Sequence, residues 1–172
     1  MITTARPLPI SKILKRSKTV QKTTVWCGKD QEEILTYKSW VSLKLILQWA
    51  KEQKGSTLNV YIPKFYCYDT IYNLQDEVNF VYYDINEGFI PDYKQCTRLN
   101  ETCQVDVFVL VHYFGIPIDA NDAKVFCKKT GAILVEDAVH VLIGEDKIGR
   151  VGVGKNREAF HGSFGAYCGK SC

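Results

Sequence analysis

The run DVFVLVHYFG, at residues 106–115, is apolar along almost its whole length. A strand with one face in water alternates apolar and polar side chains, whereas a continuous apolar run is typical of a strand covered on both faces. Strands of that kind belong to parallel sheets, because the crossover connections of such sheets place helices on both sides. The run therefore predicts a central strand of a parallel sheet.

Strand patterns and helix patterns alternate around this run. Residues 39–54 carry apolar side chains at helical spacing and are followed by Gly55, while residues 119–131 begin with acidic side chains and end with basic ones and a glycine. Short β-rich runs occur at residues 58–63, 78–85 and 132–137. This order predicts right-handed βαβ units and a three-layer α/β fold with a mainly parallel sheet.

Charged and polar side chains follow the last of these strand patterns, at Glu136, Asp137 and His140. Ligands of parallel α/β sheets bind at the carboxyl ends of the strands, so these residues are candidates for a binding site. A buried carboxylate without a partner is costly, and a cationic group of a ligand can supply one. The alternative for Asp137 alone is a cap at the start of a following helix.

Composition limits the number of domains and the class of partner. With 172 residues, 46% of them hydrophobic, the chain has enough apolar material for one domain with a core and too little for two large ones. The net charge of +3 is close to balanced and does not favour a nucleic-acid or membrane surface. The imbalance is local: residues 1–29 carry only basic charged side chains, and we interpret residues 1–30 as a solvated basic arm, with a binding arm as the alternative.

Two further patterns indicate where the chain resides. No run approaches the roughly 18 apolar residues of a membrane span, and the N-terminus lacks the apolar core of a signal peptide, so we expect a cytoplasmic protein without a membrane partner. The 7 cysteines are odd in number and include no C-x-x-C pair. This predicts reduced thiols and neither a disulfide framework nor a zinc site.

Four stretches, in this order, resemble the DegT/DnrJ/EryC1/StrS family of pyridoxal-phosphate-dependent aminotransferases of fold type I. They are VYIPKFYCYDTI (60–71), VYYDINEGFIPD (81–92), VHYFGIPID (111–119) and KKTGAILVEDAVH (128–140). The resemblance covers roughly residues 36–152 and implies that residues 31–152 form an incomplete large domain of such an enzyme. Members of this family mostly aminate keto sugar nucleotides.

The resemblance implies roles for the residues at the end of the last strand pattern. The family's aspartate in its E-D-[AS] segment pairs with the pyridine nitrogen of the cofactor and keeps it protonated, and Asp137 takes this place. The residue three positions later lies beside the phenolic oxygen of the cofactor, which is the place of His140. His112 and Tyr113 are expected to shape the same crevice through packing and hydrogen bonds, without a chemical role.

Three more cofactor contacts follow from the resemblance. The family binds the phosphate at the start of the first large-domain helix with a Gly-[Thr/Arg]-x-Ala-Leu stretch, and here SWVSL places Ser39 and Trp40 at the corresponding positions. The aromatic residue that stacks on the cofactor ring in many relatives is replaced by Cys67. Stacking would then come from Tyr66 or Tyr68, or be absent.

The resemblance ends after Gly152. The family continues with aspartate and an S-x-x-K or S-F-x-x-x-K element, whose lysine captures the cofactor aldehyde. Here Val153 follows, and no later lysine has the spacing of that element. We therefore predict that residues 153–172 are non-homologous or frameshifted, that no catalytic lysine is present, and that the chain is a truncated fragment that is inactive by itself and leaves apolar surface exposed.

Three functions remain open from the sequence. The first is a pyridoxal-phosphate-dependent aminotransferase whose intact form uses a keto substrate and an amino donor and shares its site across a homodimer. The alternative is a non-catalytic α/β module that binds a small ligand at Asp137 and His140. A nucleic-acid binder acting through the arm is a third reading, and it predicts affinity that falls steeply with salt concentration.

Overall fold

The computed structural model describes residues 32–34, 36, 38–139, 159–163 and 165–168. Its helices are α2 (Ser39–Lys54), α3 (Tyr68–Leu74), α4 (Tyr93–Thr102) and α5 (Asn121–Thr130), with a 3-10 helix η1 (Tyr113–Gly115). Its strands are β1 (Glu32–Ile34), β2 (Asn59–Pro63), β3 (Asn79–Tyr83), β4 (Val107–Val111), β5 (Ile133–Asp137), β6 (Ala159–Ser163) and β7 (Gly165–Cys168). Within these ranges, no helix combines the length and the apolar composition that a bilayer-spanning segment needs.

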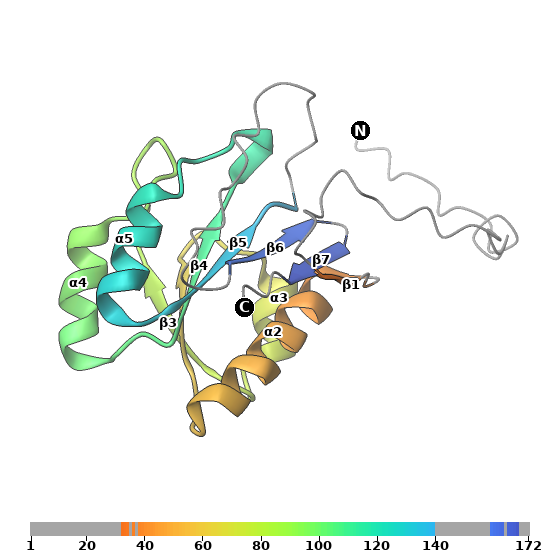
Figure 1. Cartoon of the computed structure of the whole chain (residues 1–172). Coiled ribbons are helices and arrows are strands. Elements are labelled where there is room, and N and C mark those ends of the chain that lie inside the picture. Colours follow the sequence, from red (N-terminus) through yellow and green to blue (C-terminus); the bar gives the residue numbers. More distant parts are fainter. Residues whose placement is uncertain (1–31, 35, 37, 140–158, 164, 169–172) are drawn as a thin grey trace, which may run out of the picture.

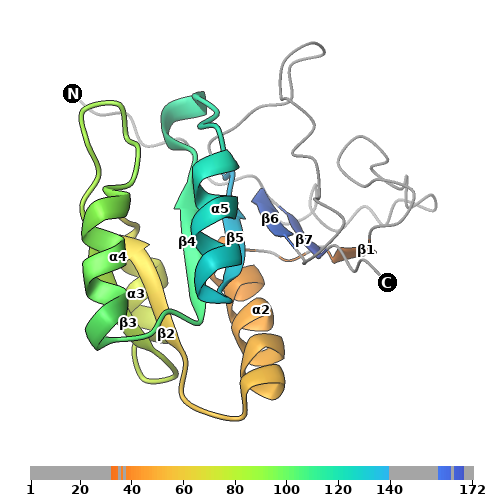
Figure 2. The ribbon, with the colours of Figure 1, turned by 60° about the vertical axis from the view of Figure 1, so that its left-hand side comes forward.

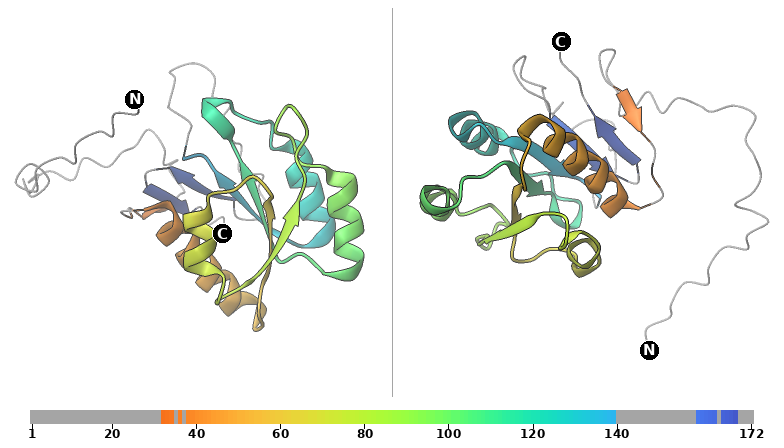
Figure 3. Two further views of the ribbon diagram at one scale, coloured as in Figure 1. Left: turned by 180° about the vertical axis from the view of Figure 1, so that it is seen from behind. Right: turned by 90° about the horizontal axis from the view of Figure 1, so that it is seen from below.

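The strands form one sheet in the order β1-β7-β6-β5-β4-β2-β3 (Figure 1). The neighbours from β3 across to β6 are all paired in parallel, and β7 is antiparallel to both β6 and β1. Helices α4 and α5 cover one face of the sheet, and α2 and α3 cover the other (Figures 2 and 3). The expected three-layer α/β fold with a mainly parallel sheet is thus confirmed.

The buried side chains of β4 explain why its sequence is apolar throughout. Val107, Val109 and Val111 join the core that packs against α2 and α3. Phe108 and Leu110 point the other way, into the core beneath α4 and α5. Successive side chains of a strand face opposite sides, so a strand covered by helices on both faces needs apolar residues at every position.

The stretch 153–172 contributes the hairpin of β6 and β7 to the sheet. Strand β6 continues the parallel part beyond β5, with Leu134 opposite Ala159 and Asp137 opposite Gly162. No strand was predicted in this stretch, which is short and rich in glycine. Its predicted origin as a non-homologous or frameshifted segment stays a prediction.

Helix α4 was not identified from its largely polar sequence, although the chain carries a signal for its start. Asp92 is the N-cap, and one of its carboxylate oxygens accepts hydrogen bonds from the backbone N–H groups of Lys94 and Gln95, each at 3.0 Å. An aspartate followed three residues later by glutamine is the spacing of a capping box. This pattern is what sequence reasoning missed.

We expect Asp92→Ala to lower the free energy of unfolding by about 1 kcal/mol, because two backbone donors lose their acceptor at the start of α4. Chemical denaturation followed by circular dichroism measures the change. Asp76→Ala, at an exposed aspartate outside the helices, is the matched control and should shift stability by less than about 0.5 kcal/mol. Equal stability of the two variants would contradict the capping role.

Candidate functional site

The two carboxylates at the end of β5 face opposite sides of the sheet. Glu136 lies on the same face of β5 as Leu134, two residues earlier, which packs in the core under α4 and α5. Asp137 lies on the same face as Val135, which packs in the core against α2 and α3. In the ladder with β4, Glu136 lies opposite Leu110 and Asp137 opposite Val111. The alternation of side chains along a strand therefore separates these neighbours and gives them different surroundings.

Glu136 forms a buried pair with His112. Their side chains are 0% and 5% exposed, and Nε2 of His112 lies 3.2 Å from Oε2 of Glu136. The backbone N–H of Ile118 donates to Nδ1 of His112 at 3.0 Å, so the ring hydrogen is on Nε2, which donates to the carboxyl group. The pair ties β4, β5 and the loop at 112–118 together. His112 thus forms its hydrogen bonds on the Glu136 side of the sheet, and its expected part in shaping the crevice at Asp137 stays a prediction.

Asp137 receives two hydrogen bonds on the other face. The hydroxyl group of Tyr66 donates to Oδ2 at 2.9 Å, and the backbone N–H of Val139 donates to Oδ1 at 3.2 Å. The second bond is of the kind that a helix cap forms, and the residues that follow, 140–158, lie outside the described part of the chain. Asp137 therefore has a fixed side chain at the carboxyl end of the sheet, where a ligand site was expected.

Burial and the neighbouring carboxylate raise the pKa of Tyr66 well above its ordinary value of 10.0. Desolvation is the larger cause, and the negative charge of Asp137 and the hydrogen bond to it act in the same direction. The hydroxyl group of Tyr66 therefore keeps its proton at neutral pH and remains a donor to Asp137.

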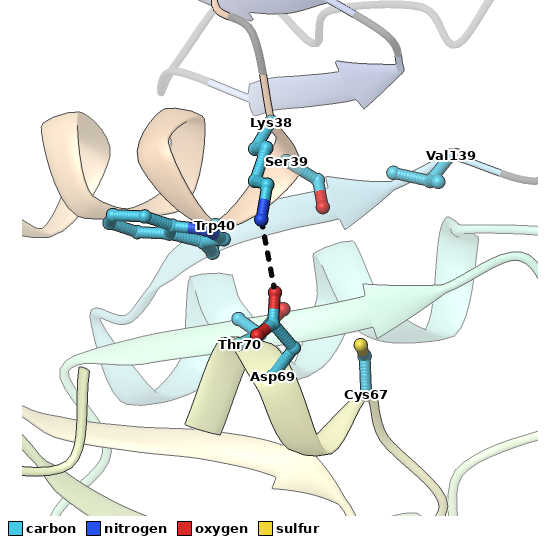
Figure 4. A pocket seen from close by; sticks show the side chains of 7 residues that line it. All are labelled: Lys38, Ser39, Trp40, Cys67, Asp69, Thr70 and Val139. Atoms are coloured by element: carbon cyan, nitrogen blue, oxygen red, sulfur yellow. Dashed lines mark ion pairs between the residues drawn. The ribbon is translucent and has the colours of Figure 1, made fainter. Parts of the chain in front are cut away.

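A pocket of about 180 Å³ lies between the N-termini of α2 and α3 and the end of β5 (Figure 4). Its lining consists of Lys38, Ser39, Trp40, Cys67, Asp69, Thr70 and Val139. Three of the predicted cofactor contacts, Ser39, Trp40 and Cys67, are brought together here from two separate segments. Asp137 lies two residues before Val139 on the same strand end. His140 lies outside the described residues, so its predicted contact is not tested.

The pocket offers an anion the N-terminus of α2 and one ammonium group, and its lining also includes the carboxylate of Asp69. Helix α2 has no acidic residue in its first turn and no side chain that caps its N-terminus, and its first residues Ser39 and Trp40 line the pocket, so the positive end of the helix dipole lies beside it. Lys38 adds an ammonium group, which lies 3.9 Å from the carboxylate of Asp69. Hydroxyl groups of Ser39 and Thr70 complete the lining. Lys38 and Thr70 were not among the predicted contacts, although a lysine directly before a helix start is a signal that the sequence carries.

Neither candidate for ring stacking lines the pocket. The ring of Tyr68 is 75% exposed and packs against Tyr72 at a centroid distance of 6.1 Å. Tyr66 uses its hydroxyl group to bind Asp137. Cys67 is an exposed free thiol whose side chain points into the pocket (Figure 4). A thiol gives small, apolar contact and cannot stack as an aromatic ring does.

Comparison with solved structures supports the fold. No family model and no curated protein matches the sequence. The structure is similar to that of 3-amino-5-hydroxybenzoic acid synthase, with a TM-score of 0.59 and 19% identity over 80% of this chain and 38% of that chain. An aminotransferase from Psychrobacter cryohalolentis gives a TM-score of 0.59 and 16% identity over 87% of this chain and 40% of that chain.

A DegT DnrJ EryC1 StrS aminotransferase from Brucella abortus is also similar, with a TM-score of 0.58 and 13% identity over 82% of this chain and 42% of that chain. The Brucella protein carries the name of the family whose motifs the sequence resembles, and all three proteins share their fold with the present chain. The chain spans less than half of the length of each of these three proteins.

Proposed function

We propose that this chain is part of a pyridoxal-phosphate-dependent aminotransferase of the DegT/DnrJ/EryC1/StrS type and that it binds pyridoxal 5'-phosphate in the pocket between α2 and α3. One observation carries the proposal. Ser39, Trp40 and Cys67, chosen from the resemblance alone, line a single pocket next to the end of the strand that carries Asp137. The shared fold with aminotransferases supports the same reading.

The described residues fit the two charged ends of this cofactor. The N-terminus of α2, the ammonium group of Lys38 and the hydroxyl group of Ser39 would hold the phosphate, because oriented N–H groups and a nearby cation favour a dianion. Asp137 would hold the protonated ring nitrogen by a charge-assisted hydrogen bond. Trp40 and Cys67 would form walls that keep water from the ring.

When bound, pyridoxal 5'-phosphate supplies an electron-accepting ring and an aldehyde that exchanges with amino groups. The residues of this chain would bind and orient it, and Asp137 would keep a proton on the ring nitrogen. A lysine with the spacing of the family's catalytic element is not found in the sequence. We therefore propose reversible cofactor binding without turnover by this chain alone.

The remaining parts of the proposal follow the family. The substrates of the intact enzyme would be a keto sugar nucleotide or a similar keto compound and an amino donor. The intact enzyme would be a cytoplasmic homodimer. The contact of His140 with the phenolic oxygen of the cofactor also belongs to this proposal.

Titration of the purified chain with pyridoxal 5'-phosphate, followed by tryptophan fluorescence, tests the proposal. Loss of the charge-assisted bond in Asp137→Asn is expected to raise the Kd by about 10- to 100-fold, which corresponds to about 1.4–2.7 kcal/mol. Asp76→Asn, at an exposed aspartate outside the pocket lining, should leave the Kd unchanged.

Borohydride reduction of the loaded protein, followed by peptide mapping, supplies a second readout. We expect no single lysine to carry the reduced adduct, because the catalytic lysine is predicted to be absent. A stoichiometric adduct on one lysine would show that the chain does bind the aldehyde covalently. Equal Kd values for the wild-type chain and Asp137→Asn would refute the assignment of Asp137.

A further inference from the structure

We propose that Tyr66 is a positioning residue: its hydroxyl group, together with the backbone N–H of Val139, holds the carboxylate of Asp137 in one orientation before a ligand binds. This inference rests on the proposed function, because it concerns how Asp137 meets the ring nitrogen of pyridoxal 5'-phosphate. The family resemblance suggested only that the ring of Tyr66 stacks on the cofactor. It assigned no role to the hydroxyl group of Tyr66.

The hydrogen bonds fix both oxygens of the carboxylate. Tyr66 donates to Oδ2 at 2.9 Å from a position 71 residues earlier in the chain, and Val139 donates to Oδ1 at 3.2 Å from the same strand end. An ionised carboxylate has about four lone-pair sites, so it can accept more than two hydrogen bonds. A carboxylate held at both oxygens loses little conformational freedom when it binds a ligand.

The backbone on either side of Tyr66 is itself held in place. The carbonyl oxygen of Phe65 accepts a hydrogen bond from the hydroxyl group of the buried Tyr113. The carbonyl oxygen of Cys67 accepts hydrogen bonds from the backbone N–H groups of Thr70 at 3.1 Å and Ile71 at 3.3 Å. The loop between β2 and α3 therefore presents the hydroxyl group of Tyr66 from a rigid frame.

The electrostatics of the pair are consistent with this role. Burial and the charge of Asp137 raise the pKa of Tyr66 well above 10.0, so its hydroxyl group donates throughout the neutral range. A donor bound to the charged form of a carboxylate favours that form. The ionised carboxylate is the form that can pair with a protonated ring nitrogen.

Removal of the hydroxyl oxygen of Tyr66 tests whether this residue positions Asp137 or only packs against its surroundings. Tyr66→Phe keeps the ring and deletes the donor, and it is expected to raise the Kd for pyridoxal 5'-phosphate by about 5- to 10-fold. This is less than the full cost of one hydrogen bond to a charged group, because Tyr66 acts on the cofactor only through Asp137. Tyr72→Phe, on a side chain of α3 that is 61% exposed, is the matched control and should leave the Kd unchanged. The denaturation midpoint of both variants should stay close to that of the wild-type chain.

Two further measurements show whether Tyr66 acts through Asp137. In the Asp137→Asn background, Tyr66→Phe should change the Kd by less than about 2-fold, because the two variants remove one coupled interaction. NMR of ¹³Cζ-labelled tyrosine should show that Asp137→Asn lowers the pKa of Tyr66, since the negative charge that helps to raise it is gone.

The outcomes distinguish this inference from the function on which it rests. If the wild-type chain does not bind the cofactor, the proposed function fails and the role of Tyr66 fails with it. If the chain binds and Asp137→Asn weakens binding while Tyr66→Phe does not, the proposed function stands and the positioning role is overturned. An equal effect of Tyr66→Phe in both backgrounds would also overturn it, because Tyr66 would then act by packing alone.

Discussion

Phe108→Ala is expected to lower the free energy of unfolding by about 3–5 kcal/mol, the range measured for loss of a fully buried aromatic side chain. The ring of Phe108 is 0% exposed in the central strand β4. It stacks on Tyr83 at a centroid distance of 5.0 Å and contacts Phe126 at 5.2 Å and Tyr93 at 6.1 Å. Alanine would leave a cavity that this rigid frame of strands and α5 cannot fill.

Equilibrium denaturation in urea measures this loss. Val125→Ala, at a side chain on α5 that is 67% exposed, is the control and should change stability by less than about 0.5 kcal/mol. Most small domains are stable by only about 5–15 kcal/mol, so Phe108→Ala is expected to remove a large part of the total. A change below about 1 kcal/mol would show that Phe108 does not pack in the core as described.

His112→Leu is expected to lower the free energy of unfolding by about 3 kcal/mol, because it leaves the buried carboxyl group of Glu136 without its hydrogen-bond donor. Glu136 is 0% exposed, and its Oε2 atom lies 3.2 Å from Nε2 of His112. Its Oε1 atom has no hydrogen-bond partner among the described residues. The loss of His112 would therefore leave a carboxyl group in the core with no partner there.

The double variant His112→Leu/Glu136→Leu tests the cause of this loss. Replacing both members of a buried pair with apolar residues is often nearly neutral, so the double variant should recover most of the stability that His112→Leu loses. The same urea experiment gives the coupling free energy. If the double variant were less stable than His112→Leu, packing of the imidazole, and not its pairing with Glu136, would explain the effect.

Local sequence patterns identify the central elements well. The apolar run at 106–115 contains β4, and the helical spacing at 39–54 coincides with α2 (Ser39–Lys54). These elements carry strong local signals, because burial on both faces of a strand and amphipathic spacing in a helix are properties of neighbouring residues. The βαβ order, and with it the parallel sheet, follows from them.

Weak elements could not be identified in the same way. Helix α4 is polar along most of its length, so only its cap at Asp92 marks it. Strands β1 and β7 are short, with 3 and 4 residues, and together with β6 they form by pairing with one another and with β5 at the edge of the sheet. Such strands depend on a partner that lies elsewhere in the chain, which no local pattern contains.

In the candidate site, too, some features follow from the sequence and others only from the tertiary structure. By itself the sequence determined that Glu136 and Asp137 leave the carboxyl end of a strand, and the resemblance placed Ser39, Trp40 and Cys67 at one cofactor. Tertiary structure decided on which face of the sheet each carboxylate lies. Glu136 pairs with His112 in the core, and Asp137 lies on the opposite face, the side of the pocket. It also decided that Tyr66 binds Asp137. Because side chains alternate along a strand, neighbouring residues face opposite sides of the sheet. Only the packed helices decide which side is buried and which distant residue contacts each side chain, such as Tyr66, 71 residues before Asp137.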